Sequence, residues 1–594
     1  MSEQDLTETK DKIAEAVLLL ANECCEQHKG HKSRGMEIFS AYIGKFREGE
    51  APTENWHSKL YAKVMKPKIL AAWSQAVQAS TSNKNMWEVT DRGSNGNEQS
   101  PAAVAMKKKL HETADQADLQ EKLKTGMFDA FLYGTQTQQA PVVETRTAKQ
   151  WKPDLMGPMN FARAMMGKPK YKPVFTSIDY PSIIHRSFFE MFPWPYSQDV
   201  QLGEGVFHRP FLTKYDLNDL MSQKGFDNAA IAEILKENPG DSKYDYLNEK
   251  MEIRGWEGKT RKGYDLIFFA GKLGRDKLQG IQGFEQESGR YVEGMFWVVN
   301  TGKGAKLIKA QPNPTVGKLR PFLMSHYEQM PGESHGMGIG ENSIEIAKAI
   351  AGAIRLFADG KKMALPMLGI DSSKLASKGG IVEFSPGKLW DFAGTDPKNA
   401  IIPIEMPDMT TGLMPFIEFL ERMHDEITGL PKWTTGVDSK MLNKTATGIS
   451  MIMNASSQLV RGSIENMDDY ILEPLGDRWY DWYMDDPNTD PTMKGDFIIS
   501  ASGLTSLMQR EALNQQLLNL LTFVINPSVL QNPWAMKMLR MVGENIGIKD
   551  VDSALPNPDQ LQAQTQIPPG VAAGQVPVSD PNAPAQPGAP VVMG

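Results

Sequence analysis

The hydrophobic pattern of this chain changes type at Pro331-Gly332, and this change restricts the possible folds more than any other feature. Before it, short apolar runs such as Tyr264–Gly271 and Tyr291–Asn300 are separated by Gly and Asp, which predicts strands. After it, apolar residues recur at helical spacing through Glu341–Lys362, which predicts a long helix. Strands followed by helices are typical of the α+β class, and we predict an α+β fold.

The N-terminal third shows helical periodicity. We expect helices from Thr9 to about Ser80, and one long amphipathic helix over Pro101–Tyr133 that ends at Gly134. The segment Thr147–Pro173 is rich in Met, Pro, Lys and Gly without periodicity, which predicts a long excursion off the core, suited to mobility or partner contact. Tyr215–Asn238 is predicted as a helical insertion among the strands.

The remainder of the chain alternates helices with turn-rich segments. After the helix at Glu341–Lys362, Met363–Met409 is predicted as short strands and turns, and Thr411–Thr428 as a second helix. Thr445–Met484 continues as a very long helix, which we expect to bend at Gly462 and Pro474.

The C-terminal part ends in a tail of unusual composition. A strand is predicted near Phe497–Ser500, followed by helices over Leu504–Phe523 and Pro533–Val542. From about Asp550 the chain is rich in Pro, Ala, Gln and Gly, and has too few large apolar groups to offset the entropy of ordering. We predict that this tail is disordered unless a partner orders it.

Composition excludes several classes of protein. The 594 residues carry 64 Lys and Arg against 72 Asp and Glu, which is opposite to the basic footprint of a protein that grips nucleic acid with its outer surface. The two cysteines, Cys24 and Cys25, are adjacent and cannot supply a disulfide framework, which indicates a reducing compartment. The best candidate membrane span, Ile344–Phe357, is interrupted by Lys348 and Arg355, and the N-terminus is not of the signal-peptide type.

Two glycine motifs resemble nucleotide-binding loops but lack required residues. Gly336–Gly340 precedes a helix, but the dinucleotide fingerprint needs a glycine where Glu341 stands, so a glycine hinge is the alternative that we favour. The GKT of Gly255–Thr260 lacks the first glycine of a phosphate loop, which would fall at Ile253.

No metal or nucleophilic site stands out. His28 and His31 form a lone pair in a charged stretch, and the acidic run from Asp486 has Pro491 where a calcium loop needs glycine. Cys24 and Cys25 lie on an amphipathic helix with no evident base, which favours a structural role. We therefore predict no enzymatic activity, no cofactor and no metal.

Five phrases occur in one order between Pro101 and Ser500. They are DAFLYGT (Asp129–Thr135), the stretch Phe175–Pro195, FLTKYDLNDLM (Phe211–Met221), the stretch Pro321–Asp371, and the stretch Phe416–Val460, in which TATGI opens the long helix. In these phrases the chain resembles the portal proteins of tailed double-stranded DNA bacteriophages, most closely the short-tailed-phage type. It departs from them at Phe192-Pro193-Trp194-Pro195, where the family usually has Asp-Pro.

The resemblance implies a ring of twelve subunits at one vertex of the capsid, through which DNA enters during packaging and leaves during ejection. It divides the chain into a wing (1–340), a first stem helix (341–362), a clip (363–409), a second stem helix (410–429), a tunnel loop (430–444), a channel and wing helix with a strand (445–502), a helical crown (503–549) and the disordered tail (550–594).

The resemblance also implies partners and a location. The partners are the terminase, which carries the packaging ATPase, the major capsid protein, a scaffolding protein and a head-completion or tail adaptor. The protein is expected in the virion after assembly in the host cytoplasm. The alternatives are another virion structural ring, such as an adaptor or tail protein, and a nucleotide-binding enzyme built on Gly336–Glu341.

Candidate DNA-facing residues follow from the need for DNA to slide. Each phosphate that a channel neutralises adds affinity, so a mostly acidic lining with few basic contacts is favoured. We predict such contacts at the tunnel-loop lysines, with solvated loop charges as the alternative, and repulsion along the second stem helix. These residues are Lys432, Lys440 and Lys444 in the loop, and Glu418, Glu421, Asp425 and Glu426 in the helix.

Candidate contact residues fall in two groups. The small residues Ala347, Ala351 and Gly352 are predicted to pack between subunits, although a helix buried in any bundle would show the same stripe. The large apolar residues of the clip are predicted to anchor intersubunit or partner contacts, with an ordinary hairpin core as the alternative. They are Leu389, Trp390 and Phe392.

Overall fold

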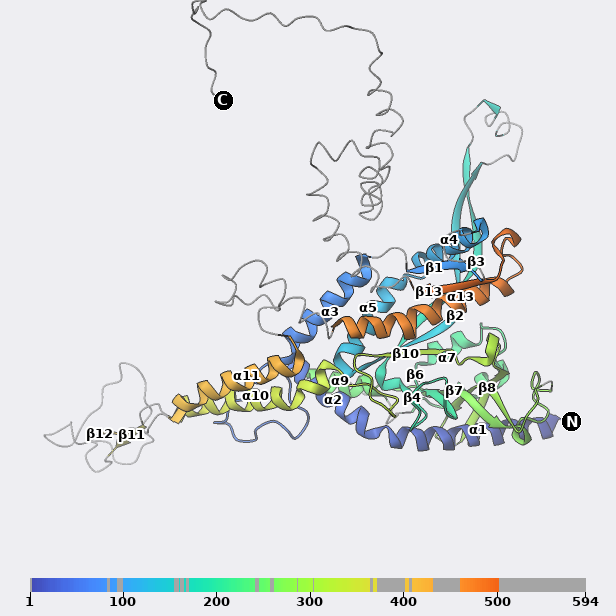
Figure 1. Cartoon of the computed structure of the whole chain (residues 1–594). Coiled ribbons are helices and arrows are strands. Elements are labelled where there is room, and N and C mark those ends of the chain that lie inside the picture. The colour runs from blue at the N-terminus through green and yellow to red at the C-terminus, as the bar shows by residue number, and fades with distance from the viewer. Residues whose placement is uncertain are drawn as a thin grey trace, which may run out of the picture. The chain divides into compact units, whose positions relative to one another are not determined.

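The computed structural model describes residues 3–82, 86–92, 100–153, 160, 165–166, 170–240, 245–256, 261–285, 287–302, 304–363, 367–370, 401–404, 409–430 and 460–501 (Figure 1). All of them lie in one compact unit that ends at Leu507. Helices and strands are both present, so the chain is of the mixed α+β type that the sequence predicts. None of the helices in these ranges is both long and apolar enough to cross a membrane.

An antiparallel sheet forms the centre of the N-terminal half. Its order is β4-β5-β7-β8-β9, with β6 paired to the other end of β7. The strands are β4 (Met191–Pro193), β5 (Gly205–His208), β6 (Phe211–Leu212), β7 (Tyr264–Gly274), β8 (Tyr291–Asn300) and β9 (Ala305–Pro312). The runs predicted as strands from their apolar residues are therefore strands, and β7 to β9 pair in chain order.

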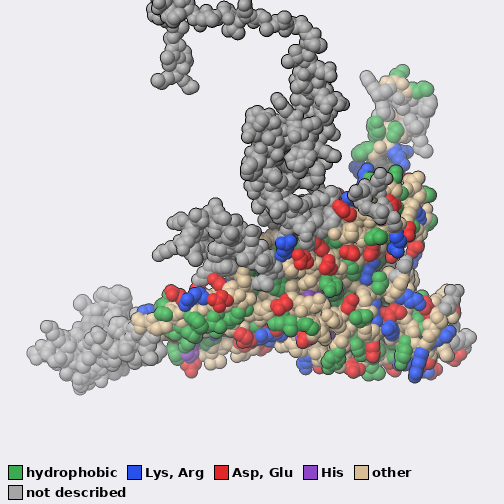
Figure 2. All heavy atoms as spheres, viewed as in Figure 1, with side chains coloured by type: hydrophobic (Ala, Val, Ile, Leu, Met, Phe, Trp, Pro, Cys, Tyr) green, Lys and Arg blue, Asp and Glu red, His purple; other side chains and the backbone are tan. Residues whose placement is uncertain are grey.

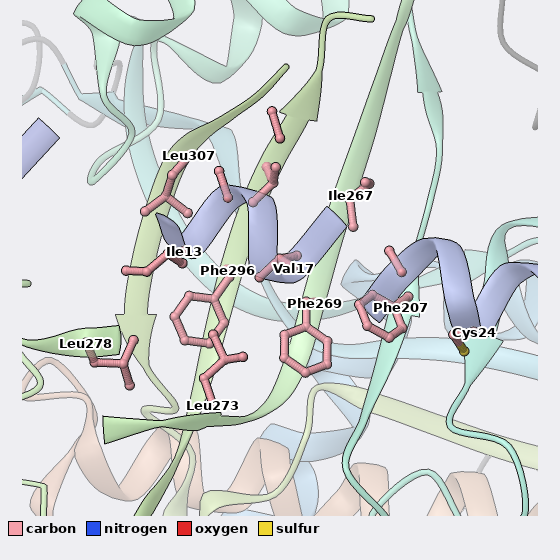
Figure 3. Close-up of a cluster of buried hydrophobic side chains, with 14 of the residues drawn as sticks. Ile13, Val17, Cys24, Phe207, Ile267, Phe269, Leu273, Leu278, Phe296 and Leu307 are labelled. Atoms are coloured by element: carbon pink, nitrogen blue, oxygen red, sulfur yellow. The ribbon is translucent and has the colours of Figure 1, made fainter. Parts of the chain in front are cut away.

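Helix α1 (Glu3–Gln27) lies across one face of this sheet (Figure 3). Its apolar side chains at Ile13 and Val17 pack against Phe269 and Phe296 of the sheet, because their helical spacing places them on one side. The opposite face of β7 carries Phe268, which packs in a second cluster with β4, β8 and β10 (Phe322–His326). Apolar cover on both faces explains the continuous hydrophobic run of β7.

The helical insertion forms two short helices, α7 (Lys214–Leu220) and α8 (Asn228–Ile234), followed by α9 (Tyr246–Arg254). Thr213 caps α7 in a capping box with Asp216, and Asp227 caps α8 through the amides of the next turn. The predicted uninterrupted insertion is thus divided, because each cap residue starts a new helix.

Four further helices pack against one another: α2 (Lys29–Ile43), α3 (Met65–Ser82), α4 (Pro101–Gln116) and α5 (Leu119–Tyr133). The prediction of one helix over Pro101–Tyr133 is wrong, because Asp118 adopts a left-handed conformation (φ 48°) and separates α4 from α5. Helix α5 ends at Gly134 with φ 92°, as predicted.

Strands β2 (Thr135–Pro153) and β3 (Tyr171–Arg186) form a long antiparallel pair. Strand β10 pairs only with Thr135–Gln139 of β2, so beyond this point β2 and β3 continue alone as a two-stranded ribbon that leaves the body (Figure 1). At the two ends of the predicted excursion, residues 147–153 and 171–173 are the outer residues of the two strands.

Helices α10 (Ile339–Met363) and α11 (Leu413–Thr428) form an antiparallel hairpin beside α2, α3 and α5. Between them, β11 (Met367–Ile370) pairs with β12 (Ile401–Ile404), and a 3₁₀ turn at Met409–Gly412 leads into α11. Both helix predictions are confirmed, with boundaries within two residues of the expected ones.

Helical residues 460–467 lead through a π-helical turn at Asp468–Leu472 into α13 (Glu473–Asp485). This π turn directly precedes Pro474, which has no N–H to donate to the preceding turn, and a bend there and at Gly462 stays a prediction. Strand β13 (Phe497–Ala501) confirms the predicted strand and pairs with β1 (Trp87–Asp91).

Several predicted features lie outside the described residues. They are the clip residues Leu389, Trp390 and Phe392, the tunnel-loop lysines Lys432, Lys440 and Lys444, the helices expected after Leu504 and the tail from Asp550.

Candidate functional site: the α10–α11 hairpin

The glycine motif at the start of α10 is used for close backbone packing against the end of α5. A Cβ atom on Gly338 would lie 2.5 Å from the amide nitrogen of Gly134, and one on Gly336 would lie 2.5 Å from the carbonyl oxygen of Glu328. The Gly336 amide donates to Thr135 Oγ1 at 2.9 Å. The glycines are therefore required where two backbone segments meet, in agreement with the hinge interpretation.

A cluster of charged residues joins the first turns of α10 to α2. Arg34 donates to Glu345 and to Glu37 at 2.8 Å each, and its Nε lies 3.4 Å from Glu341. Lys348 also pairs with Glu37. Glu341 stands in the first turn of α10, where the helix dipole favours a negative charge. These pairs fix the hairpin to the body.

The two helices of the hairpin share a small apolar core. It consists of Ile350 and Ala353 from α10 with Ile417 and Leu420 from α11. One cluster therefore holds the hairpin closed along its length.

The stripe of small residues lies mostly inside the chain. Ala347 and Ala351 are buried without any second subunit, whereas Gly352 is partly exposed and a Cβ there would meet only Arg355 Nη2, at 3.8 Å. The two alanines let α10 pack against helices of its own chain. Of the three residues, only Gly352 is exposed enough for contact with a second subunit. The packing of this stripe between subunits stays a prediction.

The acidic residues of α11 point in different directions. Glu418 and Glu426 are exposed, and Glu421 is half-buried. Asp425 instead turns toward α3, where its carboxylate pairs with Lys68 at 2.6 Å and its side chain is only 23% exposed. Asp425 thus does not belong to the exposed acidic face on which the sequence placed it.

Lys68 closes the C-terminal end of α11. Besides Asp425, its Nζ donates to Thr428 Oγ1 at 2.9 Å and to the carbonyl oxygen of Leu430 at 2.8 Å. A cation at this end also compensates the negative end of the helix dipole. The sequence carried a signal for it, because Lys68 stands in the apolar stripe formed by Met65, Ile69 and Ala72 of α3.

His424 lies beside this lysine and is buried. Its Nε2 has no partner among the described residues, and burial, followed by the charge of Lys68, lowers the pKa of His424 to about 3. The imidazole is therefore neutral at physiological pH.

Five large apolar side chains of the hairpin remain exposed to solvent. They are Leu356 of α10 and Met414, Phe416, Phe419 and Ile427 of α11, each with 46% to 63% of its surface exposed. Figure 2 shows hydrophobic side chains gathered over these two helices. Single exposed apolar residues are ordinary, but this density on one hairpin is typical of an interaction surface.

Sequence patterns did not predict that three histidines lie close together in the fold. His335 brings its ring to 4.9 Å from that of His28 and 5.3 Å from that of His31, centroid to centroid. Burial lowers the pKa of His28 to about 3. Within the described ranges, no group of three or more His, Cys, Asp or Glu residues is arranged to hold a metal ion. No sequence signal joined residues so far apart.

The two cysteines are buried side by side under the sheet. Burial raises the pKa of the Cys25 thiol, which disfavours the reactive thiolate. Cys24 donates to the carbonyl oxygen of Pro193 at 3.3 Å. Both residues therefore pack as small apolar groups, as the structural interpretation of the sequence expects.

Comparison with known families identifies the part of the chain that contains the hairpin. Residues 294–498 match the family model described as the phage SU10 portal protein. The match begins within β8, contains α10 and α11, and ends within β13, and it covers about a third of the chain. No curated protein matches the sequence. The match confirms the resemblance that the five sequence phrases indicate: over residues 294–498 this chain is similar to phage portal proteins.

Proposed function

We propose that this protein is the subunit of a portal ring of about twelve copies at a single vertex of a phage capsid. The ring conducts double-stranded DNA during packaging and ejection and has no catalytic role. The observation that carries this proposal is the family match, which contains the whole of the α10–α11 hairpin and the segments on either side of it. The hairpin then supplies the two stem helices, and residues 363–409 between them supply the clip.

The exposed apolar side chains of the hairpin support assembly. Leu356, Phe416 and Phe419 are between 49% and 63% exposed in the single chain, so they lose unfavourable contact with water when a second copy covers them. In a cyclic ring each interface joins two different surfaces of neighbouring copies, and the rotation closes the ring. The hairpin of one subunit then meets a different face of the next.

The exposed carboxylates of α11 support a conduit through which DNA slides. Glu418 and Glu426 repel phosphates, which keeps the affinity for the DNA backbone low. The basic residues Lys432, Lys440 and Lys444 follow α11 in the sequence, and we propose that they supply transient contacts at the narrowest point.

Docking of partners belongs to the clip and the wing. We propose that the terminase binds the clip through Leu389, Trp390 and Phe392, since aromatic side chains dominate such interfaces. The head-completion or tail adaptor replaces the terminase after packaging. The major capsid protein and the scaffolding protein contact the wing. In the mature particle the protein is then a component of the virion.

Electron microscopy of the purified protein tests the proposal. Class averages viewed along the particle axis are expected to show closed rings of about twelve subunits around a hole wide enough for duplex DNA. A protein that remains a monomer or a compact dimer at every concentration up to its solubility limit would contradict the proposal.

A further inference from the structure

The outer part of the β2–β3 ribbon has an aromatic face with no cover. Residues directly opposite in an antiparallel pair lie on the same face, and faces alternate along each strand. The register pairs Lys149 with Phe175. Trp151 lies on the same face one step further out, and Tyr171 two steps further out. Trp151, Tyr171 and Phe175 are each more than half exposed, so one face of the ribbon presents three aromatic rings to solvent.

The ribbon is also strongly basic. Residues 145–153 and 171–179 contain four Lys and Arg against one Asp, a net charge of +3 in a chain whose net charge is −8. Lys149 lies on the aromatic face with Nζ 4.6 Å from the centre of the Trp151 ring, whereas Lys152 and Lys172 oppose each other on the other face. Basic groups therefore lie on both faces of the ribbon.

A ribbon of this kind needs a partner. Two strands without a third strand or a helix to cover them are marginally stable in water, and their exposed edges invite pairing. The aromatic face has no use against a phosphate backbone, because duplex DNA would be held by the charges alone. A protein surface that is acidic complements the ribbon better.

The chain carries such a surface on α13. Glu473, Asp477, Asp481 and Asp485 follow one another at steps of four, so that neighbours in this acidic row approach each other on the helix surface. Partial burial, followed by the charges of Glu473 and Asp481, raises the pKa of Asp477 to about 6. Figure 2 shows acidic side chains along the helix that is orange in Figure 1. Like charges at this spacing destabilise a helix unless a cation lies opposite.

The acidic row is only partly compensated by a nearby cation, because the charge of Arg92 lowers the pKa of Asp477 less than burial and the neighbouring carboxylates raise it. Among the residues that the structure describes, no Lys or Arg forms an ion pair with these four carboxylates. Helix α13 instead packs at the inner end of the ribbon, where Arg478 donates to the carbonyl oxygen of Ala140 at 2.6 Å. Lys149 stands nine residues further out, which is about 30 Å along the strand. The basic residues of the ribbon and the acidic row of α13 are therefore too far apart to pair within one chain. Each surface can instead bind a different neighbouring molecule.

We propose that the ribbon formed by residues 145–153 and 171–179 docks on the acidic row of α13 in the next copy of this chain. The proposal rests on the portal ring proposed above and names a contact that closes it. Such a contact joins two different surfaces, which is the arrangement that a closed ring requires. It also covers the aromatic face and places cations beside carboxylates that otherwise repel one another.

Charge reversal on each surface tests the contact. The ribbon variant carries Lys149→Glu, Lys152→Glu and Lys172→Glu. The row variant carries Glu473→Lys, Asp477→Lys and Asp481→Lys. All six positions lie at the surface or are half-buried, so both variants are expected to fold. In each variant alone, like charges face each other across the contact. The protein concentration at which half of the subunits are in rings is then expected to rise at least about tenfold. Mass photometry and electron microscopy measure this concentration.

Mixing the two variants distinguishes a contact between subunits from any other effect. In an equimolar mixture each ribbon finds a row of opposite charge on the other variant, so rings of alternating subunits are expected at about the wild-type concentration. The matched control, Lys29→Glu with Lys108→Glu and Lys277→Glu, makes the same change of net charge on exposed lysines elsewhere and is expected to assemble normally.

Other outcomes would overturn the contact without touching the proposed function. Rings of the ribbon variant at wild-type concentration would exclude the docking. If those rings also lost affinity for duplex DNA, the ribbon would be a DNA contact. If the mixture failed while a chain with all six changes assembled, the contact would lie within one chain. If the wild type formed no rings, the portal proposal would fail as well.

Discussion

Lys68 of α3 and Asp425 of α11 form an ion pair, with Nζ 2.6 Å from Oδ1, although they are 357 positions apart in the chain. The lysine side chain is 7% exposed and that of the aspartate 23%, so water screens the pair only partly. Because the same ammonium group also donates to Thr428 and Leu430, it holds the end of α11 against the body. Lys68 therefore couples the end of α11 to the N-terminal helix α3.

Replacing this lysine should weaken the fold at the base of the hairpin. Lys68→Met leaves the Asp425 carboxylate and the Leu430 carbonyl without their donor, and we expect the free energy of unfolding to fall by about 3 kcal/mol. Urea denaturation measures the loss. Lys59→Met, at an exposed position, is the control and should change stability by less than about 0.5 kcal/mol. Equal stability of the two variants would show that the pair contributes nothing.

Two glycines, Gly338 just before α10 and Gly352 within it, should respond in opposite ways to alanine. Gly338→Ala places a methyl group against the backbone of Gly134, so we expect a loss of about 2 kcal/mol or more. Gly352→Ala meets open space within a helix and should stabilise the chain by up to about 1 kcal/mol. Thermal unfolding of both variants checks the prediction. A harmless Gly338→Ala would contradict the packing role of the glycine motif.

Acid should destabilise the protein through its buried histidines. The pKa of His28 and that of His424 are both lowered to about 3, and that of His335 lies well below its usual value. Below an unfolded-state pKa of about 6.5, the unfolded chain binds protons that the folded chain does not. Stability is therefore full above about pH 6.5 and falls as the pH drops toward 3, by up to about 1.4 kcal/mol per pH unit for each histidine.

The slope of unfolding free energy against pH between 6.5 and 5, compared for wild type and His424→Gln, tests this effect. The slope of the variant should be shallower, because the variant lacks the contribution of His424 to the pH dependence. Asp477, with its pKa raised to about 6, acts in the opposite direction, so the difference between the two proteins is the readout rather than the whole curve. Identical slopes would mean that His424 is protonated in the folded chain.

The exposed aromatic residues of α11 should matter for assembly but not for folding. Phe416→Ser with Phe419→Ser removes two side chains that are each 49% exposed in the single chain, so the free energy of unfolding should fall by no more than about 2 kcal/mol, and the chain should stay folded. Ring formation, measured by sedimentation velocity, should be lost at the wild-type concentration. Leu19→Ser, at a position 71% exposed on α1, is the control. Rings that persist in the double variant would exclude this face from the interface.

The acidic residues of α11 should keep affinity for DNA low. Glu418→Lys with Glu426→Lys converts repulsion into phosphate contacts, so assembled rings should bind duplex DNA more tightly. The salt dependence should steepen by about 0.9 for each phosphate that is newly neutralised. Fluorescence anisotropy at several salt concentrations measures both effects, with Glu48→Lys and Glu204→Lys as the exposed control pair. If the control pair had the same effect, α11 would not line the conduit.

Local patterns predicted much of the secondary structure. Helix α10 was expected at Glu341–Lys362 and spans Ile339–Met363, because its apolar periodicity and its boundaries depend on nearby residues alone. The break between α4 and α5 was not predicted, since Asp118 interrupts the helix through its left-handed backbone without disturbing the spacing of apolar residues. The ribbon was expected only as an excursion, because nothing local indicates that its strands pair.

The sequence by itself determined the mixed class, the hairpin helices, the cap at Gly134 and the portal resemblance, because periodicity, turn chemistry and ordered phrases are written within short stretches. Only the tertiary structure decided which side chains face outward. Ala347 and Ala351 lie inside, Phe419 lies in solvent, and Asp425 turns to Lys68 rather than to the acidic face. The physical reason is that burial and charge pairing depend on neighbours that the fold brings from far along the chain.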